Sequence, residues 1–370
     1  MTSAAVQAGS RVPAWFCGDV LVPFAVSRLG LTLVGLFVSA GNWLGIWSGW
    51  DGGWYLSIAR NGYVQHATEQ SNTAFAPALP LVMHLVGVLV GDEANSTVIL
   101  IGGFVAVNAA LLIALGYLVA LTRLDFDAGT ARRAALYALV FPSTLFLSAV
   151  YPHAFFLAGA VPAFYYARRG RWWLAGAFAA LAVLSRVQGL LILLPLALEY
   201  LAQRRFDLRR IKPDAGGLLL PVVAVLAYAT LMFVQVGDAL AMLHAAATWG
   251  REPSAPWDTI LSFITKPVGE HGSDRSPLDL AFTFLLVALV VVSWARLRRS
   301  LALFSATFLL FSLSSGLLVS SMRYGLELFP VFIALAISGR YRAFHFAYLA
   351  IAGYLALRFM SEFAQGLWVA

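Results

Sequence analysis

Residues 97–121 read TVILIGGFVAVNAALLIALGYLVAL, a stretch without a single charged side chain. An α-helix needs about 20 apolar residues to cross the hydrocarbon core of a bilayer, so this stretch is long enough to span a membrane. The whole chain is 61% hydrophobic and 12% charged, whereas soluble domains have about 45–50% apolar and about 25% charged residues. The sequence therefore predicts a polytopic membrane protein.

Similar apolar runs recur along the chain, and we expect about eleven of them to span the membrane. They lie near 21–45, 97–121, 134–149, 153–168, 172–186, 188–203, 216–236, 277–297, 301–319, 325–339 and 346–366. Helices are predicted because the runs are too long and too uniformly apolar for strands of a membrane barrel. The first run has a loose cleavage site at Val38-Ser39-Ala40, but Arg28 interrupts it and many spans follow. We therefore interpret it as a signal anchor rather than a cleaved signal peptide.

The segment 76–91 (APALPLVMHLVGVLVG) is ambiguous, because it is short and contains Pro77 and Pro80. Charge resolves the ambiguity. The basic clusters are Arg123/Arg132/Arg133, Arg168/Arg169/Arg171, Arg204/Arg205/Arg209/Arg210/Lys212, Arg296/Arg298/Arg299 and Arg340/Arg342. If 76–91 does not fully cross, all five lie on the same side of the membrane as the N-terminus with its Arg11, and if it crosses they lie on the opposite side. The positive-inside rule favours the first arrangement. We expect a juxtamembrane or re-entrant helix there, a cytoplasmic N-terminus, and two long external loops at 46–96 and 237–276.

Several classes of soluble protein are excluded. The excess of 25 basic over 18 acidic residues is explained by membrane topology, so no nucleic-acid partner is predicted. The sequence contains no GxxxxGK[ST], HExxH, CxxC or GxSxG motif, which argues against a nucleotide loop, a zinc site and a hydrolase elbow. Cys17 is the single cysteine, so no intrachain disulfide can form. We predict no cofactor and no metal ligands, and leave a divalent-ion requirement open.

The stretch 50–63, WDGGWYLSIARNGY, follows the first span and holds the most informative acid of the chain, Asp51. A carboxylate at a membrane edge is costly to desolvate, so it is a functional candidate. The alternative is structural, because Asp is a favoured N-cap and a helix is expected to start near Gly53.

The sequence resembles the PIG-V mannosyltransferase family of the GT-C superfamily. The resemblance rests on ordered segments: WDGGWY (50–55), AFAPALPL (74–81), FPS (141–143) with YPH (151–153), SRVQG (185–189), GDAL (237–240) with WG (249–250), and RY (323–324) with FP (329–330). It implies a single transmembrane domain over residues 1–370 with a GT-C helical bundle. One departure is His153, which stands where the family usually has an acid, and this weakens the case for a paired-acid or metal-bridged site.

The resemblance implies transfer of a sugar from a polyprenyl phosphate to an acceptor hydroxyl on the external face of the cell membrane. A hydroxyl needs a base, and Asp51 matches the acid of the family's first loop. Cations stabilise a leaving phosphate, and the external candidates are Arg186, Arg323, Arg60 and His153. The expected substrate contacts are Trp50, Trp54, Tyr55, Tyr151, Gln188, Tyr324 and Trp249. The acceptor would be a glycolipid or a glycan, and direct attack would invert the anomeric centre.

Structural alternatives accompany these assignments. Arg186 and Arg323 could anchor helix ends in headgroups, and Trp249 and Trp257 could belong to an aromatic belt. His153 could be a polar turn residue. Glu327 lies four residues after Arg323 and could form a helix pair with it.

Arg28 could pair with an acid, line a cavity or snorkel to the interface. Two other functions stay open for the whole chain: a transporter or flippase for a lipid-linked sugar, and a non-catalytic subunit of a membrane glycosylation complex.

Overall fold

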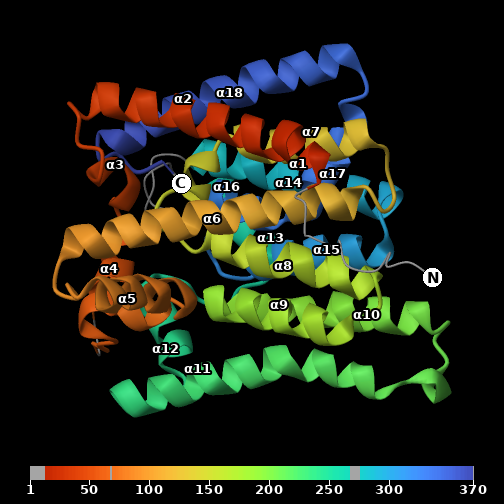
Figure 1. The fold of residues 1–370 in the computed structure, drawn as a ribbon, viewed down its shortest axis with the longest axis horizontal. Helices are drawn as coiled ribbons and strands as arrows, with labels where there is room; N and C mark the ends of the chain where they lie inside the picture. Colours follow the sequence, from red (N-terminus) through yellow and green to blue (C-terminus); the bar gives the residue numbers. More distant parts are fainter. Residues whose placement is uncertain (1–12, 67–68, 267–275, 370) are drawn as a thin grey trace, which may run out of the picture.

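The computed structural model describes residues 13–66, 69–266 and 276–369, which are helical with connecting turns and contain no strand (Figure 1). The expected loop 237–276 lies partly outside the described residues, and the N-terminal stretch 1–12 lies wholly outside them. The longer helices are α2 (Val22–Val38), α6 (Ser96–Thr122), α8 (His153–Arg168), α11 (Leu220–Val236), α14 (Ser276–Arg296), α15 (Arg299–Leu313) and α18 (Arg342–Ala364).

Shorter helices connect and cover them. They are α1 (Ala14–Phe16), α3 (Gly45–Ser48), α4 (Asp51–Asn61), α5 (Ala78–Val90), α7 (Ala128–Val140), α9 (Trp172–Ser185), α10 (Leu193–Gln203), α12 (Ala241–Thr248), α13 (Pro256–Thr265), α16 (Ser321–Tyr324) and α17 (Phe329–Ser338). One π-helical turn, η1 (Cys17–Leu21), precedes α2. The 3₁₀ turns are η2 (Asn72–Ala74), η3 (Thr144–Leu147), η4 (Val187–Ile192), η5 (Leu208–Arg210), η6 (Pro213–Leu219) and η7 (Gly325–Glu327).

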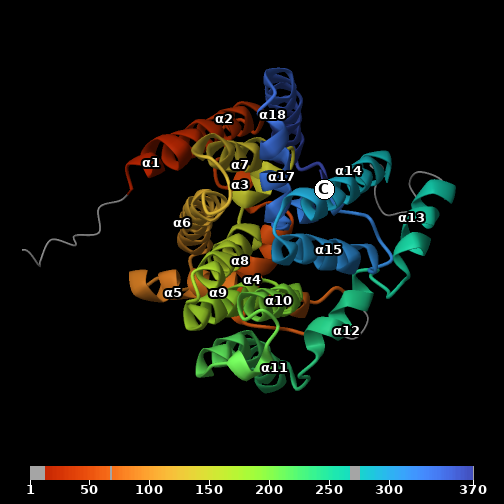
Figure 2. The ribbon, with the colours of Figure 1, turned by 90° about the vertical axis from the view of Figure 1, so that its right-hand side faces the viewer.

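The long helices run side by side and stack in layers (Figures 1 and 2). α2 and α18 pair at the top of both views, α6 and α8 pack together in the middle, and α9 separates α8 from α11 at the bottom. α12 and α13 form a rim along one side (Figure 2). The core lies around α8, whose residues are almost all buried, so this helix is a rigid support for whatever lies at its ends.

Five described helical segments are long and apolar enough to cross a membrane: Ala14–Val38, Ser96–Thr122, Pro213–Val236, Pro277–Arg296 and Arg342–Ala364. A sixth is possible if Ser321–Glu327 and Phe329–Ser338, which meet at 86°, form one broken span. Shorter apolar helices such as α5, α9 and α15 accompany them. The chain is therefore a multi-pass membrane protein, and the expected number of eleven spans stays a prediction.

Several predicted spans have different boundaries in the structure. The run 134–149 is split, because α7 ends at Val140 and only the short turn η3 follows. Pro142 lacks a backbone N–H and restricts the residue before it, so a helix rarely continues through such a position. The run 325–339 is likewise broken, since α17 begins only at Phe329, just before Pro330. Uniform hydropathy concealed both breaks.

The segment 76–91 contains α5, whose 13 residues would extend about 20 Å and thus fall short of the roughly 30 Å hydrocarbon core. It folds back along the first part of α6. A side chain at Gly103 would meet Met83, and one at Gly102 would meet Val86. Gly91, with φ of +74°, ends α5 in the left-handed conformation that glycine adopts at low cost. The length of α5 is that of a helix too short to cross, and the place of 76–91 relative to the membrane stays a prediction.

Arg28 is buried in α2 and donates hydrogen bonds to the carbonyl oxygens of Leu139 (3.2 Å) and Thr144 (2.9 Å). It also donates to the hydroxyls of Ser148 and Thr144. Its contacts therefore satisfy the carbonyls left free where α7 breaks. Snorkelling is the wrong interpretation for this residue, because its side chain binds protein atoms inside the bundle.

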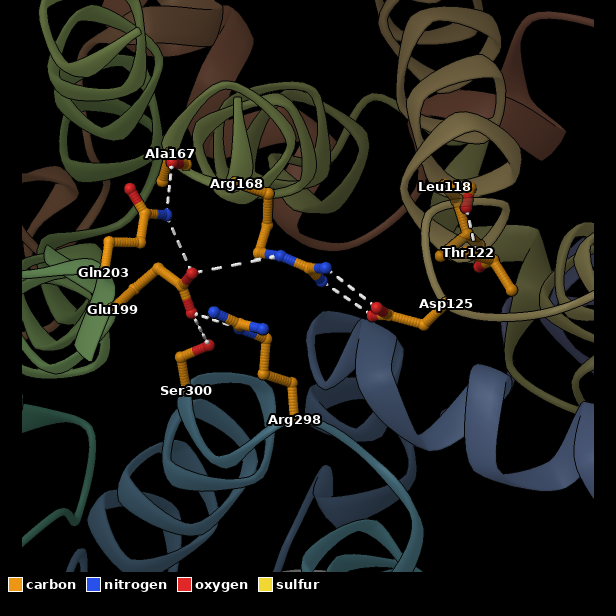
Figure 3. Close-up of polar contacts among 9 residues, drawn as sticks. All are labelled: Leu118, Thr122, Asp125, Ala167, Arg168, Glu199, Gln203, Arg298 and Ser300. Atoms are coloured by element: carbon orange, nitrogen blue, oxygen red, sulfur yellow. Dashed lines mark hydrogen bonds and ion pairs between the residues drawn. The ribbon is translucent and has the colours of Figure 1, made fainter. Parts of the chain in front are cut away.

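The two ends of α8 define two ends of the bundle. His153 lies at the first end of α8, which we call the Asp51 end. The segments 47–51, 185–188 and 323–327 meet there. Val150 N also donates a hydrogen bond to Trp47 O at this end (2.8 Å). Arg168 lies at the second, which we call the Glu199 end (Figure 3). Glu199 is 1% exposed and accepts hydrogen bonds from Arg298 (2.7 Å), Ser300 and Gln203. Arg168 binds Asp125 (2.6 Å), so several predicted basic connections meet at one end.

Candidate active site

Asp51 is the first residue of α4, and its carboxylate faces another element rather than its own helix. Oδ2 accepts a hydrogen bond from Arg323 Nη1 at 2.8 Å. The N-cap of α4 is Trp50, and no side chain caps this helix. The alternative of Asp51 as a structural N-cap is therefore wrong.

The backbone around Asp51 is held in a strained turn. Trp50 has φ of +55°, a region that bulky residues rarely occupy, and its ring contacts Trp368 edge-on at 5.1 Å. The Tyr151 hydroxyl accepts from Asp51 N (3.1 Å) and donates to Gly49 O (3.2 Å). Strain of this kind persists where surrounding contacts fix it, and it often marks a functional site.

Arg323 is 7% exposed and lies among aromatic rings. Its guanidinium carbon is 5.5 Å from the Phe146 ring, 5.6 Å from Tyr151 and 5.5 Å from Trp368. Such contacts stabilise a desolvated cation. Arg323 is therefore part of a buried cluster, and the alternative of an anchor in lipid headgroups is wrong.

Glu327, which the sequence suggested only as a helix partner of Arg323, lies in the same cluster as the expected site residues. Its Oε1 lies 2.7 Å from His153 Nδ1 and 2.9 Å from Arg186 Nη1, and the residue is 1% exposed. The expected pair with Arg323 does not form, because α16 ends at Tyr324 and the chain tightens into η7. A second carboxylate thus reaches the 150–153 turn from a distant segment. An acid within an apolar span is itself a functional signal, and it could have identified this residue.

Arg186 is fixed on three sides. Besides Glu327, it donates to the Gln188 amide oxygen from Nε (2.6 Å) and Nη2 (2.8 Å), with the amide turned so that its oxygen faces the arginine. Its guanidinium also covers the Tyr324 ring at 5.0 Å. Arg251, which the sequence did not suggest, donates to the Tyr324 hydroxyl (2.6 Å) and lies over the same ring. Arg186 therefore belongs to the site and is not a helix-end anchor.

The expected aromatic substrate contacts form a neighbouring cluster around Phe75. Trp54 stacks on Phe75 with ring centroids 5.9 Å apart, while Tyr55 and Trp249 meet the same ring edge-on. Trp249 also contacts Trp54, and its Nε1 is buried without a hydrogen-bond partner. Trp249 thus packs inside the protein, unlike Trp257, which is 70% exposed as a membrane-belt residue would be.

Arg60 is not brought into the cluster. It is exposed at the last turn of α4, where Nη1 donates to Ser96 Oγ at 3.0 Å. Nine residues of helix separate it from Asp51, which corresponds to about 14 Å. The other expected cations and His153 do converge at the Asp51 end.

A second polar cluster occupies the start of the 237–276 loop. Asp238 accepts hydrogen bonds from His244 Nδ1 (2.6 Å), Leu240 N (2.9 Å) and Gln65. The hydrogen bond from His244 is the largest cause that lowers the pKa of the Asp238 carboxyl. Gln65 and His244 also line a small cavity of about 70 Å³ with His66, Ser71 and Thr248. Among the described residues no group of three or more His, Cys, Asp or Glu side chains is arranged to hold a metal ion.

The geometry thus joins two arginine–carboxylate pairs, Asp51–Arg323 and Glu327–Arg186, at one end of a membrane bundle. A carboxylate can accept a proton, and paired guanidinium groups can bind an anion. A helical membrane bundle of this kind is the fold of membrane glycosyltransferases of the GT-C type.

Comparison with known proteins agrees with this class. The sequence matches the family described as Mannosyltransferase (PIG-V) over residues 34–243, and the chain therefore belongs to that family. No curated protein matches the sequence significantly.

Solved structures share the fold. The archaeal oligosaccharyltransferase AglB from Archaeoglobus fulgidus, in complex with an inhibitory peptide and a dolichol-phosphate, matches with a TM-score of 0.52 and 15% identity. That match covers 96% of this chain and 56% of the enzyme. The same archaeal enzyme tethered to an acceptor peptide matches with a TM-score of 0.54 and 14% identity over 96% of this chain. The chain spans 55% of the length of that second structure.

Proposed function

We propose that this protein transfers mannose from a polyprenyl-phosphate-mannose donor to a hydroxyl of a lipid-linked or glycan acceptor. The reaction would take place on the external face of the cell membrane, within a single transmembrane domain over residues 1–370. The observation that carries the proposal is the Asp51–Arg323 pair beside the Glu327–Arg186 pair. The dolichol-phosphate in complex with the archaeal oligosaccharyltransferase further supports a lipid-phosphate carrier.

Asp51 is the proposed general base. Its side chain is 17% exposed, so an acceptor hydroxyl can approach it, whereas the Glu327 side chain is 2% exposed. Asp51 takes the proton of the hydroxyl as that oxygen attacks the anomeric carbon. The bond from the anomeric carbon to the phosphate oxygen breaks, and its electron pair leaves with the phosphate. Attack from the opposite face inverts the anomeric centre and gives an α-mannoside from a β-linked donor.

Arg323 and Arg186 are the proposed phosphate ligands. The planar fork of a guanidinium matches phosphate oxygens, and a preorganised cation stabilises the charge that develops on the leaving group. Trp54 and Trp249, which are only partly buried, are the proposed stacking partners for sugar rings. No cofactor is needed for this displacement, and we propose that no metal ion is required.

The decisive experiment incubates the purified protein with polyprenyl-phosphate mannose and a native membrane lipid extract, followed by mass spectrometry of the products. We expect a product heavier by one hexose, formed equally well with EDTA present. Polyprenyl-phosphate glucose serves as the control for the sugar. Absence of transfer combined with movement of the lipid-linked sugar across liposomes would replace the proposal with a flippase. Absence of both would favour a non-catalytic subunit.

A further inference from the structure

Glu327 has no part in the proposed transfer, although it contacts one of the two arginines that we assign to the phosphate. We propose that Glu327 is a built-in counter-ion, which holds Arg186 while the site is empty and gives it up to the phosphate of the lipid carrier. This inference rests on the proposed function, because it takes that phosphate as the ligand of Arg186.

An empty site needs an internal anion next to Arg186. Glu327 is 1% exposed, and the Arg186 side chain is 15% exposed, so neither charge is well solvated. A buried charge without a partner is strongly destabilising. The 2.9 Å contact between Glu327 Oε1 and Arg186 Nη1 removes that penalty as long as no phosphate is bound.

Arg186 is arranged so that one edge can change partner while the rest stays in place. Nε and Nη2 are bound by the Gln188 oxygen, and the guanidinium face lies on Tyr324. Only Nη1 contacts Glu327. Because the arginine is more exposed than the carboxylate, an incoming phosphate can reach it from the open side of the site.

His153 allows Glu327 to release Arg186. Its Nδ1 lies 2.7 Å from the same carboxylate oxygen, so Glu327 retains a hydrogen bond after the arginine has turned to the phosphate. An acid at position 153 would instead bring two carboxylates together, which is unfavourable. A histidine at position 153, in place of the acid usual in the family, is therefore compatible with a glutamate at position 327.

The proposed exchange predicts the direction in which the affinity for phosphate should change when Glu327 is replaced. A carboxylate next to Arg186 opposes phosphate binding and helps the phosphate product to leave. Glu327→Gln should therefore bind a polyprenyl phosphate more tightly, by roughly tenfold, since nearby like charges oppose binding. Turnover at saturating donor should fall, because the phosphate product is retained. A residue with a purely structural role would give unchanged or weaker binding.

The test measures the affinity of purified protein for farnesyl phosphate by thermal unfolding, with farnesol as the neutral control. Glu199→Gln is the matched variant, because Glu199 is equally buried and binds Arg298 at 2.7 Å at the opposite end of the bundle (Figure 3). That variant should unfold at a lower temperature without any change in affinity. Glu327→Gln combined with His153→Glu restores a carboxylate beside Arg186, and it should return the affinity towards the wild-type value.

Affinity equal to or weaker than wild type in a folded Glu327→Gln protein would overturn the inference. If that variant unfolds when empty, farnesyl phosphate should restore folding better than farnesol, and failure to do so would also overturn it. The mannose-transfer assay separates the two proposals. If the wild type transfers mannose but Glu327→Gln binds farnesyl phosphate no more tightly, only the counter-ion exchange is wrong. If Glu327→Gln binds farnesyl phosphate more tightly but the wild type transfers no mannose, only the donor assignment is wrong.

Discussion

The residues of the site differ in how visible they are from the sequence. Asp51, Arg186 and Arg323 stand in recognisable segments, and the structure brings them together at one end of the bundle. Glu327 is harder to interpret, because a spacing of four residues suggests a helix pair with Arg323. Its partners in the structure are His153, which is 174 residues away in the sequence, and Arg186. Contacts over such separations depend on how helices pack, which local spacing does not encode.

Replacement of Asp51 by Asn tests the general base. The amide keeps the shape of the side chain but cannot take a proton, so turnover should fall by about 10² to 10⁴. Binding of farnesyl phosphate should remain, because both arginines are retained. Single-turnover kinetics with polyprenyl-phosphate mannose measures the effect. Asp238→Asn, which changes an acid bound to His244 in a separate cluster, should change the rate little. Near-normal turnover by Asp51→Asn would refute the assignment.

Replacement of Arg186 and Arg323 together by Ala tests the phosphate site. Each guanidinium offers several donors to a phosphate, so the double variant should bind farnesyl phosphate at least roughly a hundredfold more weakly. Arg60→Ala should have a smaller effect, because that exposed arginine binds Ser96 away from the cluster. Affinity of the double variant equal to that of the wild type would remove the arginines from the phosphate site.

At the scale of single elements, the sequence identified where apolar helices occur better than where they end. Breaks at Pro142 and before Phe329 depend on backbone details within uniformly apolar runs. Arg28 compensates for the backbone hydrogen bonds lost at the first of these breaks, because it donates to the carbonyl oxygens of Leu139 and Thr144. The sequence indicated an unusual cation within a span but not the carbonyls that it would satisfy.

The contact between α8 and α9 depends on glycine. A Cβ at Gly159 would lie 2.5 Å from Ala182 N and 2.7 Å from Phe178 O, so the helices could not keep their separation. Gly159→Ala should lower the free energy of unfolding by about 1–3 kcal/mol and reduce transfer, because α8 carries His153. Gly353→Ala in α18 is the control. Its Cβ would meet nothing within 4 Å, so thermal unfolding should occur at the same or a slightly higher temperature. Equal stability of both variants would contradict the close-packing argument.

At the scale of the whole molecule, the bundle separates two kinds of buried ion pair. The Asp51 end has two arginine–carboxylate pairs among aromatic rings, an arrangement that suits a changing ligand. The Glu199 end joins α8, α10 and the start of α15 through Arg168, Glu199 and Arg298 (Figure 3), which suits a permanent connection. Alternation of basic clusters in the sequence anticipated this division, because successive helices return the chain to the same end. It could not show which side chains would meet there.

The two ends should therefore face opposite sides of the membrane, with the Glu199 end in the cytoplasm. Cysteine labelling can test this, because Cys17 is the single native cysteine and can be replaced by Ser. Glu93→Cys probes the exposed turn that precedes α6 at the Asp51 end, and Arg205→Cys probes the exposed turn after α10. In intact cells, a membrane-impermeant maleimide should label position 93 but not 205, and permeabilised cells should show labelling of both. Labelling of both positions from the same side would require a different number of crossings between residues 93 and 205, and it would contradict the separation of the two ends. Labelling of 205 alone would place the site in the cytoplasm and exclude an external acceptor.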